Sequence, residues 1–556
     1  MARIKTIIIP PKLAAPLPPR SLGERIHEVA FIFILCLAQF LSLAAMNQTV
    51  APMLILAEYF DIRDYGNLSW FSAAYSMTVG TFILPAGRLG DIYGHKRIFL
   101  AGWAWFATWS LIAGFCTPTQ LIWFSACRAL QGIGPALTIP TAIALIGQTF
   151  PVGLRRNLAF ACFGASGPTG AALGAVMAAL VAQTASWHWC FYILAAVCAL
   201  LIPISYILIP SPTPTFPRKG DPIPKFDVPG AVTGVVGLVL VNFALNQAPL
   251  VDWSTPYVPA LFVAGVVSLA VFVWVELRVA EQPIIPLRGL QRNAAFTLAC
   301  VFAGWSSHGI WVYYLYIFLE HLRGHSALLT SAETSPVAVT GIFFAFLTVW
   351  MLRRIPVSWV MFFAMGFFTL GGILMAVAPL EQPYWGNVFV AVVLMPGAMN
   401  LSFPAATILL SEALPREKQG IAASLVATVV NYSISCGLGF AGSIHKSALL
   451  SASRKAGMAV DGGQPPPPLS ETSSELVAVR LIGLRYAYWF AVALGGLGML
   501  IAAMFILVQK AEERRKRRDL EKGGIGEDGS PRGSVAGVTT FYMGDKIIRV
   551  LDGSKS

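Results

Sequence analysis

A short segment of glycines and charged residues at 87–97 interrupts a strongly apolar sequence and could act as a conformational latch. The residues that would form the latch are Gly87, Gly90, Asp91, Gly94, Lys96 and Arg97. Glycine permits a tight turn and a close approach of two helices, and the Asp91 carboxylate can pair with a cation or accept hydrogen bonds at a helix N-terminus. A charge cluster that must break before two helical bundles separate would hold one conformation. The alternative is a basic loop that only sets membrane orientation.

The elements that must hold this connector are membrane-spanning helices. The chain has 556 residues, of which 56% are hydrophobic and 12% charged, whereas a soluble domain has about 25% charged residues. Apolar stretches of about 20 residues cross a bilayer as helices, because a helix satisfies its own backbone groups. We therefore predict an all-α polytopic membrane protein with 14 transmembrane helices. The predicted spans are 29–57, 68–86, 98–116, 121–147, 157–182, 190–209, 228–247, 256–276, 294–318, 333–351, 357–378, 386–410, 419–441 and 486–508.

The net charge of +12 is explained by membrane orientation and not by nucleic-acid binding. With the N-terminus in the cytoplasm and fourteen crossings, 31 of the 39 Lys and Arg residues fall on the cytoplasmic side, seven fall outside, and Arg128 lies within a span. This bias is the positive-inside rule. It predicts a multi-pass integral membrane protein with both termini in the cytoplasm, in the plasma membrane or alternatively the vacuolar membrane.

Several other function classes lack the residues that they need. No G-x-x-x-x-G-K-[ST] phosphate loop occurs, so no ATP site is expected. The eight cysteines have no C-x-x-C spacing and the seven histidines are scattered, which argues against a metal site and against a membrane-embedded enzyme. No cofactor is expected beyond a proton gradient.

The predicted spans divide the chain into seven segments. These are a disordered cytoplasmic tail at 1–27, a six-helix bundle at 28–209, a cytoplasmic linker at 210–226, a central two-helix insert at 227–276, a second linker at 277–293, a second six-helix bundle at 294–508 with an outer loop at 444–484, and a basic cytoplasmic tail at 509–556. The last tail is charged and glycine-rich, and we expect it to be disordered apart from its helical start.

An internal repeat relates the two bundles. The segment Leu137–Leu145 contains Pro140, and the segment Leu401–Leu409, at an offset of 264 residues, contains Pro404. Both segments end the fourth span of a six-span set, and both lead into a basic loop. Two spans that point the same way at matched positions predict parallel repeats, as in transporters whose halves face each other about an axis along the membrane normal.

The motifs resemble those of the major facilitator superfamily. Segment 87–97 is similar to the G-x-L-a-D-x-x-G-x-K/R motif, and Arg128, Gln131 and Gly132 are similar to R-x-x-Q-G. The stretch Trp187–Tyr192 resembles W-R-W-x-F. The fifth span resembles the antiporter motif G-x-x-x-G-P-x-x-G-G through Gly164, Gly167 and Pro168. Gly170 and Gly174 continue the glycine spacing of this span.

The resemblance covers about 28–508 and extends to the fourteen-helix drug:proton antiporter branch. Within that branch the chain is most similar to fungal proteins linked to aminotriazole or boron resistance and to low-affinity ammonium transport. It implies a major facilitator fold, alternating access, and a role of the fifth span in preventing leakage. From the residues alone, the glycines of that span would serve close helix packing and Pro168 would introduce a kink.

The candidates for proton coupling are Arg128, Gln131 and His308. Arg128 is the one permanently charged residue deep in a predicted span, where a charge costs about 2.5–3.5 kcal/mol, so it should face a wet cavity or a partner. A structural arginine bonded to helix carbonyls is the alternative. His308 titrates in a useful range, although a lone histidine on an apolar helix is more often a core residue.

Two departures weaken the inference of proton antiport. Fourteen-helix antiporters commonly carry an Asp in the first span, where this chain has Asn47, and position 171 is Ala where the antiporter motif has Gly. No Asp or Glu falls near a predicted bilayer midplane; Glu320, for example, lies near a span end. Proton coupling is therefore an expectation from the resemblance.

The substrate cavity should lie between the two bundles. Its candidate lining residues are Gln39, Asn47, Trp70, Tyr75, Trp305, Tyr313, Asn400 and Asn431. They are neutral, which suits uncharged or weakly charged small molecules. The alternative for each residue is a role in packing or in a hydrogen bond between helices.

The leading hypothesis is a secondary active transporter, acting as a monomer, that exports small toxic molecules by alternating access. The first alternative is a facilitator of a small solute such as ammonium or boric acid without proton coupling. The second is a non-transporting membrane sensor on the same fold.

Overall fold

The computed structural model describes residues 22–150, 154–210, 226–285, 287, 292–412, 420–457, 473–523, 538–543 and 546–551. Residues 1–21 of the 1–27 tail lie outside these residues, while 22–27 belong to the first helix. Nearly all of the 210–226 linker and the middle of the 444–484 loop also lie outside them. The predictions for those segments therefore stay predictions.

Helices dominate the described chain, as predicted. The first set is α1 (Leu22–Val50), α2 (Met53–Tyr59), α3 (Tyr65–Tyr93), α4 (His95–Gly114), α5 (Leu121–Thr149), α6 (Leu154–Thr184) and α7 (Trp187–Leu208). The second set is α8 (Val228–Val251), α9 (Tyr257–Arg278), α10 (Arg292–Tyr316), the π-helix η2 (Ile317–Leu322), α11 (Ala327–Thr334), α12 (Pro336–Leu352), α13 (Val357–Ala376), α14 (Asn387–Glu412), α15 (Gly420–Lys455) and α16 (Ser474–Gly523).

Twelve helices of the described chain are long and apolar enough to cross a membrane. The fold is therefore that of an all-helical polytopic membrane protein, but the predicted total of fourteen is not established by length and composition. The helices α3 and α4 do not belong to the twelve. The reason is polar content: α3 carries several Ser and Thr residues together with Arg88 and Asp91, and α4 begins with His95, Lys96 and Arg97.

The surface of the bundle is apolar where it faces outward. Large side chains such as Val339, Phe346 and Leu500 are 70–73% exposed. A soluble monomer rarely exposes such contiguous apolar surface. These side chains are therefore suited to contact lipid, as the composition predicted.

The prediction of one continuous first span at 29–57 is wrong. The helix α1 ends at Val50, and a separate short helix, α2, begins at Met53. Pro52 lies at the break, where it has no N–H to donate to the carbonyl four residues earlier and its ring disfavours a continuous helix. The break places α2 as a separate element beside the end of α1.

The pattern of helix contacts in the first half recurs in the second half. In the first half α1 packs on α6, α3 on α5, and α4 on both α5 and α7; in the second half α10 packs on α15, α12 on α14, and α13 on both α14 and α16. Pro140 lies in α5 and Pro404 in α14, which occupy the same place in the two patterns. This correspondence matches the repeat that the sequence predicted.

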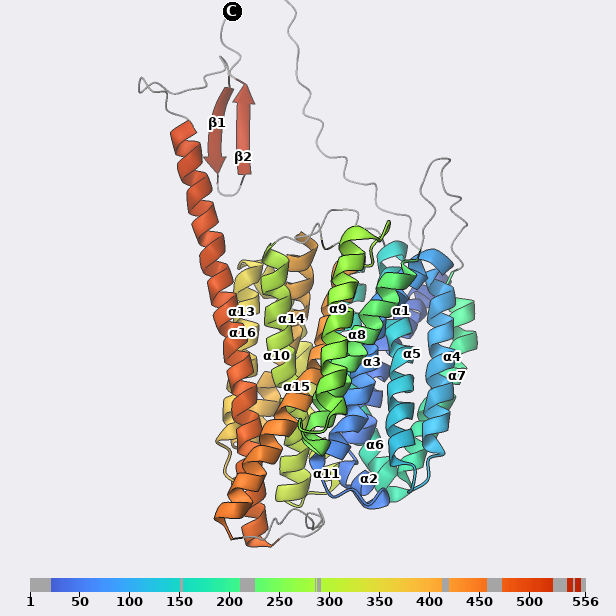
Figure 1. Cartoon of the computed structure of the whole chain (residues 1–556). Coiled ribbons are helices and arrows are strands. Elements are labelled where there is room, and N and C mark those ends of the chain that lie inside the picture. The colour runs from blue at the N-terminus through green and yellow to red at the C-terminus, as the bar shows by residue number, and fades with distance from the viewer. Residues whose placement is uncertain are drawn as a thin grey trace, which may run out of the picture.

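The helices α8 and α9 pack on each other, and α8 also packs on α3 and α15. Figure 1 shows this green pair at the front, between the blue helices of the first half and the yellow to red helices of the second. Two glycines allow the close contact of the pair, since a Cβ at Gly237 or at Gly265 would lie within 2.9 Å of backbone or side-chain atoms of the other helix.

The C-terminal segment differs from the prediction of a tail that is disordered beyond a short helical start. The helix α16 continues to Gly523 and extends well beyond the rest of the bundle (Figure 1). Strands β1 (Val538–Met543) and β2 (Lys546–Leu551) then pair antiparallel. Both strands contain β-branched residues, and β1 also contains Phe541 and Tyr542; such residues favour extended pairing.

Candidate functional site

The 87–97 connector is a one-residue turn between two helices. The helix α3 ends at Tyr93 and α4 begins at His95, and Gly94 between them has a φ of +94°. L side chains rarely adopt this conformation. Glycine is therefore required at 94 by the backbone and not by crowding, since a Cβ there would meet nothing within 4 Å.

The charged groups of the connector contact one another and the segment after α9. The carboxylate of Asp91 lies 3.4 Å from Nε2 of His95 and 4.0 Å from Nη1 of Arg88. The Nη2 atom of Arg88 donates to Oε1 of Gln282 at 2.5 Å. The connector therefore contacts the segment that joins α9 to α10, a partner that the sequence did not predict.

The glycine at 87 marks where the connector approaches the second half. A Cβ on Gly87 would lie 3.6 Å from Oγ of Ser424 in α15 and 3.8 Å from Pro140 in α5. Lys96 lies 4.8 Å from the ring of Tyr206, and Arg97 is exposed. This arrangement is compatible with a latch between halves, and the latch itself stays a prediction.

Arg128 is fully buried inside the first half and bonded to helix carbonyls. Its Nε donates to the carbonyl of Phe71 in α3 at 3.1 Å, and its Nη2 donates to the carbonyl of Ala45 in α1 at 2.9 Å. The ring of Tyr75 lies 4.6 Å from the guanidinium carbon. Among the described residues, no carboxylate lies within salt-bridge distance. Arg128 thus connects α1, α3 and α5. This is the role of a structural arginine bonded to helix carbonyls, the alternative to a coupling residue.

Gln131 extends this network to α4. Its Oε1 accepts a hydrogen bond from Nη1 of Arg128, and its Nε2 donates to Oγ of Ser110 at 2.8 Å. Tyr75 also donates to the carbonyl of Ser42 in α1 at 2.8 Å. The R-x-x-Q spacing places both side chains on one face of α5, so that one network joins four helices.

The glycines of α6 face α1. Added Cβ atoms would collide with the backbone of Phe40 at Gly170 and with Ala44 at Gly174. Asn47 of α1 donates to the carbonyl of Ala171 at 3.2 Å. The two helices are therefore in close contact, and the amide of Asn47 serves this contact.

The remaining residues of the α6 motif have different surroundings. A Cβ at Gly164 would meet nothing within 4 Å, whereas one at Gly167 would lie 3.4 Å from Nε2 of Gln39. The ring of Pro168 lies against Gly341 of α12, where a Cβ would be 2.9 Å from it. Pro168 thus marks a contact between the two halves.

Two of the predicted cavity residues, Trp305 and Tyr313, lie along α10 with the coupling candidate His308. His308 is buried, and its ring lies 5.4 Å from that of Trp305 and 6.1 Å from that of Trp311. Trp305 donates to Oγ of Ser402 at 3.1 Å, and Tyr313 donates to the carbonyl of Tyr65 in α3 at 2.7 Å. His308 therefore lies within an aromatic cluster of the second half.

The other predicted cavity residues do not form one cluster. The ring of Trp70 packs on Phe243 of α8 at 5.2 Å, while Tyr75 belongs to the Arg128 network. Asn400 and Asn431 are half-buried and donate to carbonyls of their own helices, at 3.0 and 2.9 Å. The structure thus distributes these residues among several helix contacts.

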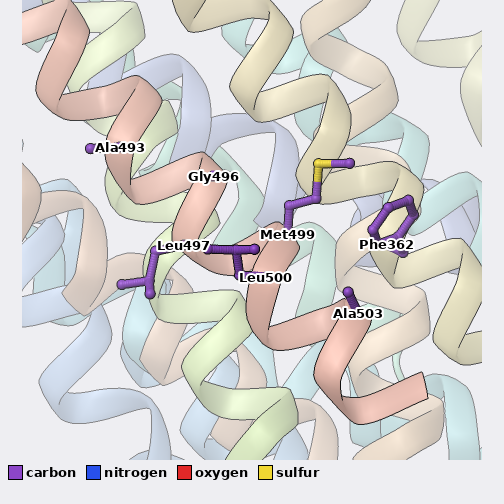
Figure 2. A pocket seen from close by; sticks show the side chains of 7 residues that line it. All are labelled: Phe362, Ala493, Gly496, Leu497, Met499, Leu500 and Ala503. Atoms are coloured by element: carbon purple, nitrogen blue, oxygen red, sulfur yellow. The ribbon is translucent and has the colours of Figure 1, made fainter. Parts of the chain in front are cut away.

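An apolar groove lies on the outside of the bundle between α13 and α16, away from the residues above. Figure 2 shows its lining, which consists of Phe362, Ala493, Gly496, Leu497, Met499, Leu500 and Ala503. Leu500 is 70% exposed. A shallow groove of this composition is suited to a lipid chain and lacks the polar groups that orient a transported solute.

One polar cluster was missed by the sequence reasoning. Glu320 and His321 in η2 and Arg480 in α16 are all buried, together with Tyr65 of α3. Arg480 and His321 are in contact, as are His321 and Tyr65. The available signal was the pair of ionisable residues that follows the aromatic run of α10, but their position near a span end favoured exposure.

Comparisons with known proteins agree with this architecture. The sequence profile of the Major Facilitator Superfamily matches residues 34–440. The chain is 45% identical to the low affinity ammonium transporter of Saccharomyces cerevisiae, over 88% of this chain and 89% of the other. It is 38% identical to the efflux pump terJ of Aspergillus terreus, over the same shares.

A solved structure gives the same fold. An inward-facing, unoccupied structure of a bacterial homologue of the human lysosomal transporter Spinster matches with a TM-score of 0.57, covering 86% of this chain and 98% of the other. The sequence identity is 14%, so the match concerns the fold alone.

Proposed function

This chain belongs to the Major Facilitator Superfamily, and we propose that it uses that transporter fold to export small toxic or xenobiotic molecules by alternating access. The resemblance stated from the motifs is thereby confirmed at the level of the family. Membership makes the protein a membrane transporter of small molecules and not an enzyme. Its relationship to efflux pumps supports the direction of export.

The observation that carries alternating access is the way in which the two halves meet. The helix α3 packs on α15, and α6 packs on α12. Gly80 and Gly341 lie at these contacts, against Tyr432 and Pro168 respectively. Close contacts through glycine allow helices of separate halves to pivot without long interlocking side chains. The same helix pairs recur within each half, as expected of two rigid bundles.

The proposed topology has fourteen crossings. The helices α3 and α4 contain 29 and 20 residues, and at 1.5 Å per residue twenty residues span about 30 Å, the thickness of the hydrocarbon core. Adding them to the twelve apolar helices gives six crossings in each half, with α8 and α9 as a central insert. Both termini are then cytoplasmic, and the protein acts as a monomer in the plasma membrane.

Cysteine accessibility tests this topology. Single cysteines in place of Arg97 and Arg354, both exposed, should react with an impermeant reagent from the cytoplasmic side only. Reaction of the two positions from opposite sides would rule out the fourteen-crossing topology.

A second candidate function is uncoupled transport of ammonium or a similarly small solute. It is favoured by the 45% identity to a low affinity ammonium transporter. Counterflow of methylammonium, borate, aminotriazole and azoles in proteoliposomes, with and without a pH gradient, separates the candidates. Export predicts accumulation of the toxic compounds driven by the gradient. Facilitation predicts methylammonium or borate exchange at a rate that the gradient does not change.

A further inference from the structure

A buried carboxylate lies where α10 ends in a π-helix. Glu320 in η2 is 2% exposed, and neither of its oxygens has a hydrogen-bond partner among the described residues. The backbone of Leu54 in α2 approaches the carboxylate without reaching hydrogen-bond geometry. A charged carboxylate buried in this way costs several kcal/mol, and single π-turns are frequent at functional sites.

The surroundings of Glu320 are polar but incompletely bonded. The helix α11 packs on η2, and the hydroxyl of Thr330 in α11 is buried without a partner in the described part of the chain. Tyr316 of α10, which also lies near Glu320, contacts Oγ1 of Thr334 at 3.0 Å. Buried polar groups are usually paired, so this concentration of unpaired groups indicates a functional position.

The same region joins the two halves of the transporter. Tyr65 of α3 contacts Nδ1 of His321, and Tyr313 donates to the carbonyl of Tyr65 at 2.7 Å. Figure 1 shows α2 and α11 together at the end of the bundle opposite the extension of α16. In the proposed topology this end faces outward. Opening the outer face must therefore break these contacts and expose Glu320 to water.

The contact with Arg480 assigns the hydrogen-bonding roles of the His321 ring nitrogens. The Nη1 atom of Arg480 lies 3.0 Å from Nε2 of His321, and a guanidinium can only donate. Nε2 therefore accepts, the ring proton lies on Nδ1, and the hydroxyl oxygen of Tyr65 accepts it.

The other titratable and charged groups near η2 have varied surroundings. Asp64, the N-cap of α3, accepts from the backbone N–H of Asn67 at 2.9 Å, and the ring of the buried His445 lies 5.2 Å from that of Tyr65. Arg323 donates to the carbonyl of Pro379 at 3.0 Å, and the Nε of Arg485 in α16 is buried without a partner among the described residues.

Glu333 of α11 lies 3.0 Å from Nδ1 of His325, and Arg480 of α16 contacts His321. Glu58 of α2 is exposed. Glu320 is thus the buried carboxylate of this region whose charge can change when the outer face opens.

We propose that Glu320 binds a proton from the outer aqueous phase during the transport cycle and that this protonation allows α2 and α3 to close over η2. This inference rests on the proposed function. The bond that forms is the O–H bond of the carboxyl group, hydronium on the outer side supplies the proton, and no other group changes charge. The neutral acid can be buried in the closed form, whereas the carboxylate holds the outer face open to water.

Spin labels across the outer contact test the inference without a substrate. Cysteines replace the exposed Glu58 and Ala332, and the exposed Cys162 is changed to Ser. With Glu320 present, the distance distribution between the labels should shift to longer values as the pH rises. If one proton is involved, the ratio of open to closed populations should increase by up to about tenfold per pH unit. E320Q, a neutral mimic, should stay closed at every pH.

The matched control is E333Q, which changes a carboxylate of the neighbouring helix α11 and should keep the pH response. A pH response that survives in E320Q, or distances that do not depend on pH when Glu320 is present, would overturn the inference. Transport in proteoliposomes is measured separately. If the unmodified protein transports none of the candidate substrates, the proposed function is wrong. The pH dependence of the label distances still tests the role of Glu320 in that case.

Discussion

Gly80 of α3 lies directly against Tyr432 of α15, at a contact between the two halves of the transporter. A Cβ at position 80 would be 2.6 Å from the backbone nitrogen of Tyr432 and 3.1 Å from its Cα. The obstacle is backbone and cannot rotate away, so any larger residue must separate the two helices.

We expect G80A to slow transport strongly and to destabilise the protein by about 1–3 kcal/mol through overpacking. The control is G164A, because a Cβ at Gly164 meets nothing within 4 Å. Counterflow rates and melting temperatures in detergent give both readouts. Normal transport by G80A at normal stability would show that this contact does not constrain the halves.

Replacing Arg128 by Ala should lower stability as well as transport. The change leaves the carbonyls of Phe71 and Ala45 without their donor, which costs about 1–3 kcal/mol for each buried group. R97A, which removes an exposed arginine, is the control, and melting temperature is the measurement. An unchanged melting temperature in R128A would argue against a structural tie.

The polar contact between α8 and α15 should contribute a measurable coupling energy. The hydroxyl of Ser435 donates to Oδ1 of Asn242 at 2.7 Å, and the carbonyl of Ala73 in α3 is a second acceptor at 2.9 Å. A double-mutant cycle with N242A and S435A should give about 0.6 kcal/mol, the average for such bonds in membranes. Combining N242A with S443A, which changes a hydroxyl bonded only within α15, should give no coupling. If the effects of N242A and S435A are additive, the hydrogen bond between these two residues does not stabilise the protein.

The turn at Gly94 should resist substitution for a reason different from that at Gly80. G94A meets no neighbour, but a φ of +94° with a ψ of 127° costs about 1–3 kcal/mol for an L residue. G23A, in α1 and equally unobstructed, should be neutral or stabilising because alanine favours a helix. Thermal stability of the two variants provides the comparison. Equal stability would mean that the turn relaxes at no cost.

The positions of helix ends were harder to predict than the helices themselves. Hydropathy identifies an apolar run, but it reads through Pro52, where α1 ends, and it stops before the polar continuations of α15 and α16. Of the candidate site, the network of Arg128 and Gln131 and the close contact of α6 with α1 follow spacings visible in the sequence. The scattered positions of Trp70, Asn400 and Asn431 do not, because which face of a buried helix meets which neighbour depends on packing.

The sequence by itself determined that this protein is a helical membrane transporter of the Major Facilitator Superfamily. The apolar composition indicates that lipid surrounds most of the chain. The motifs of glycine and charged residues are short, so they can be recognised from consecutive positions in the sequence. The tertiary structure alone decided which polar groups lie buried together. Glu320 and Arg480 are 160 residues apart in the chain. In the folded protein Arg480 contacts His321, the residue next to Glu320, and all three are buried. Only folding determines whether a charged residue near the end of a helix faces water or is covered by another helix.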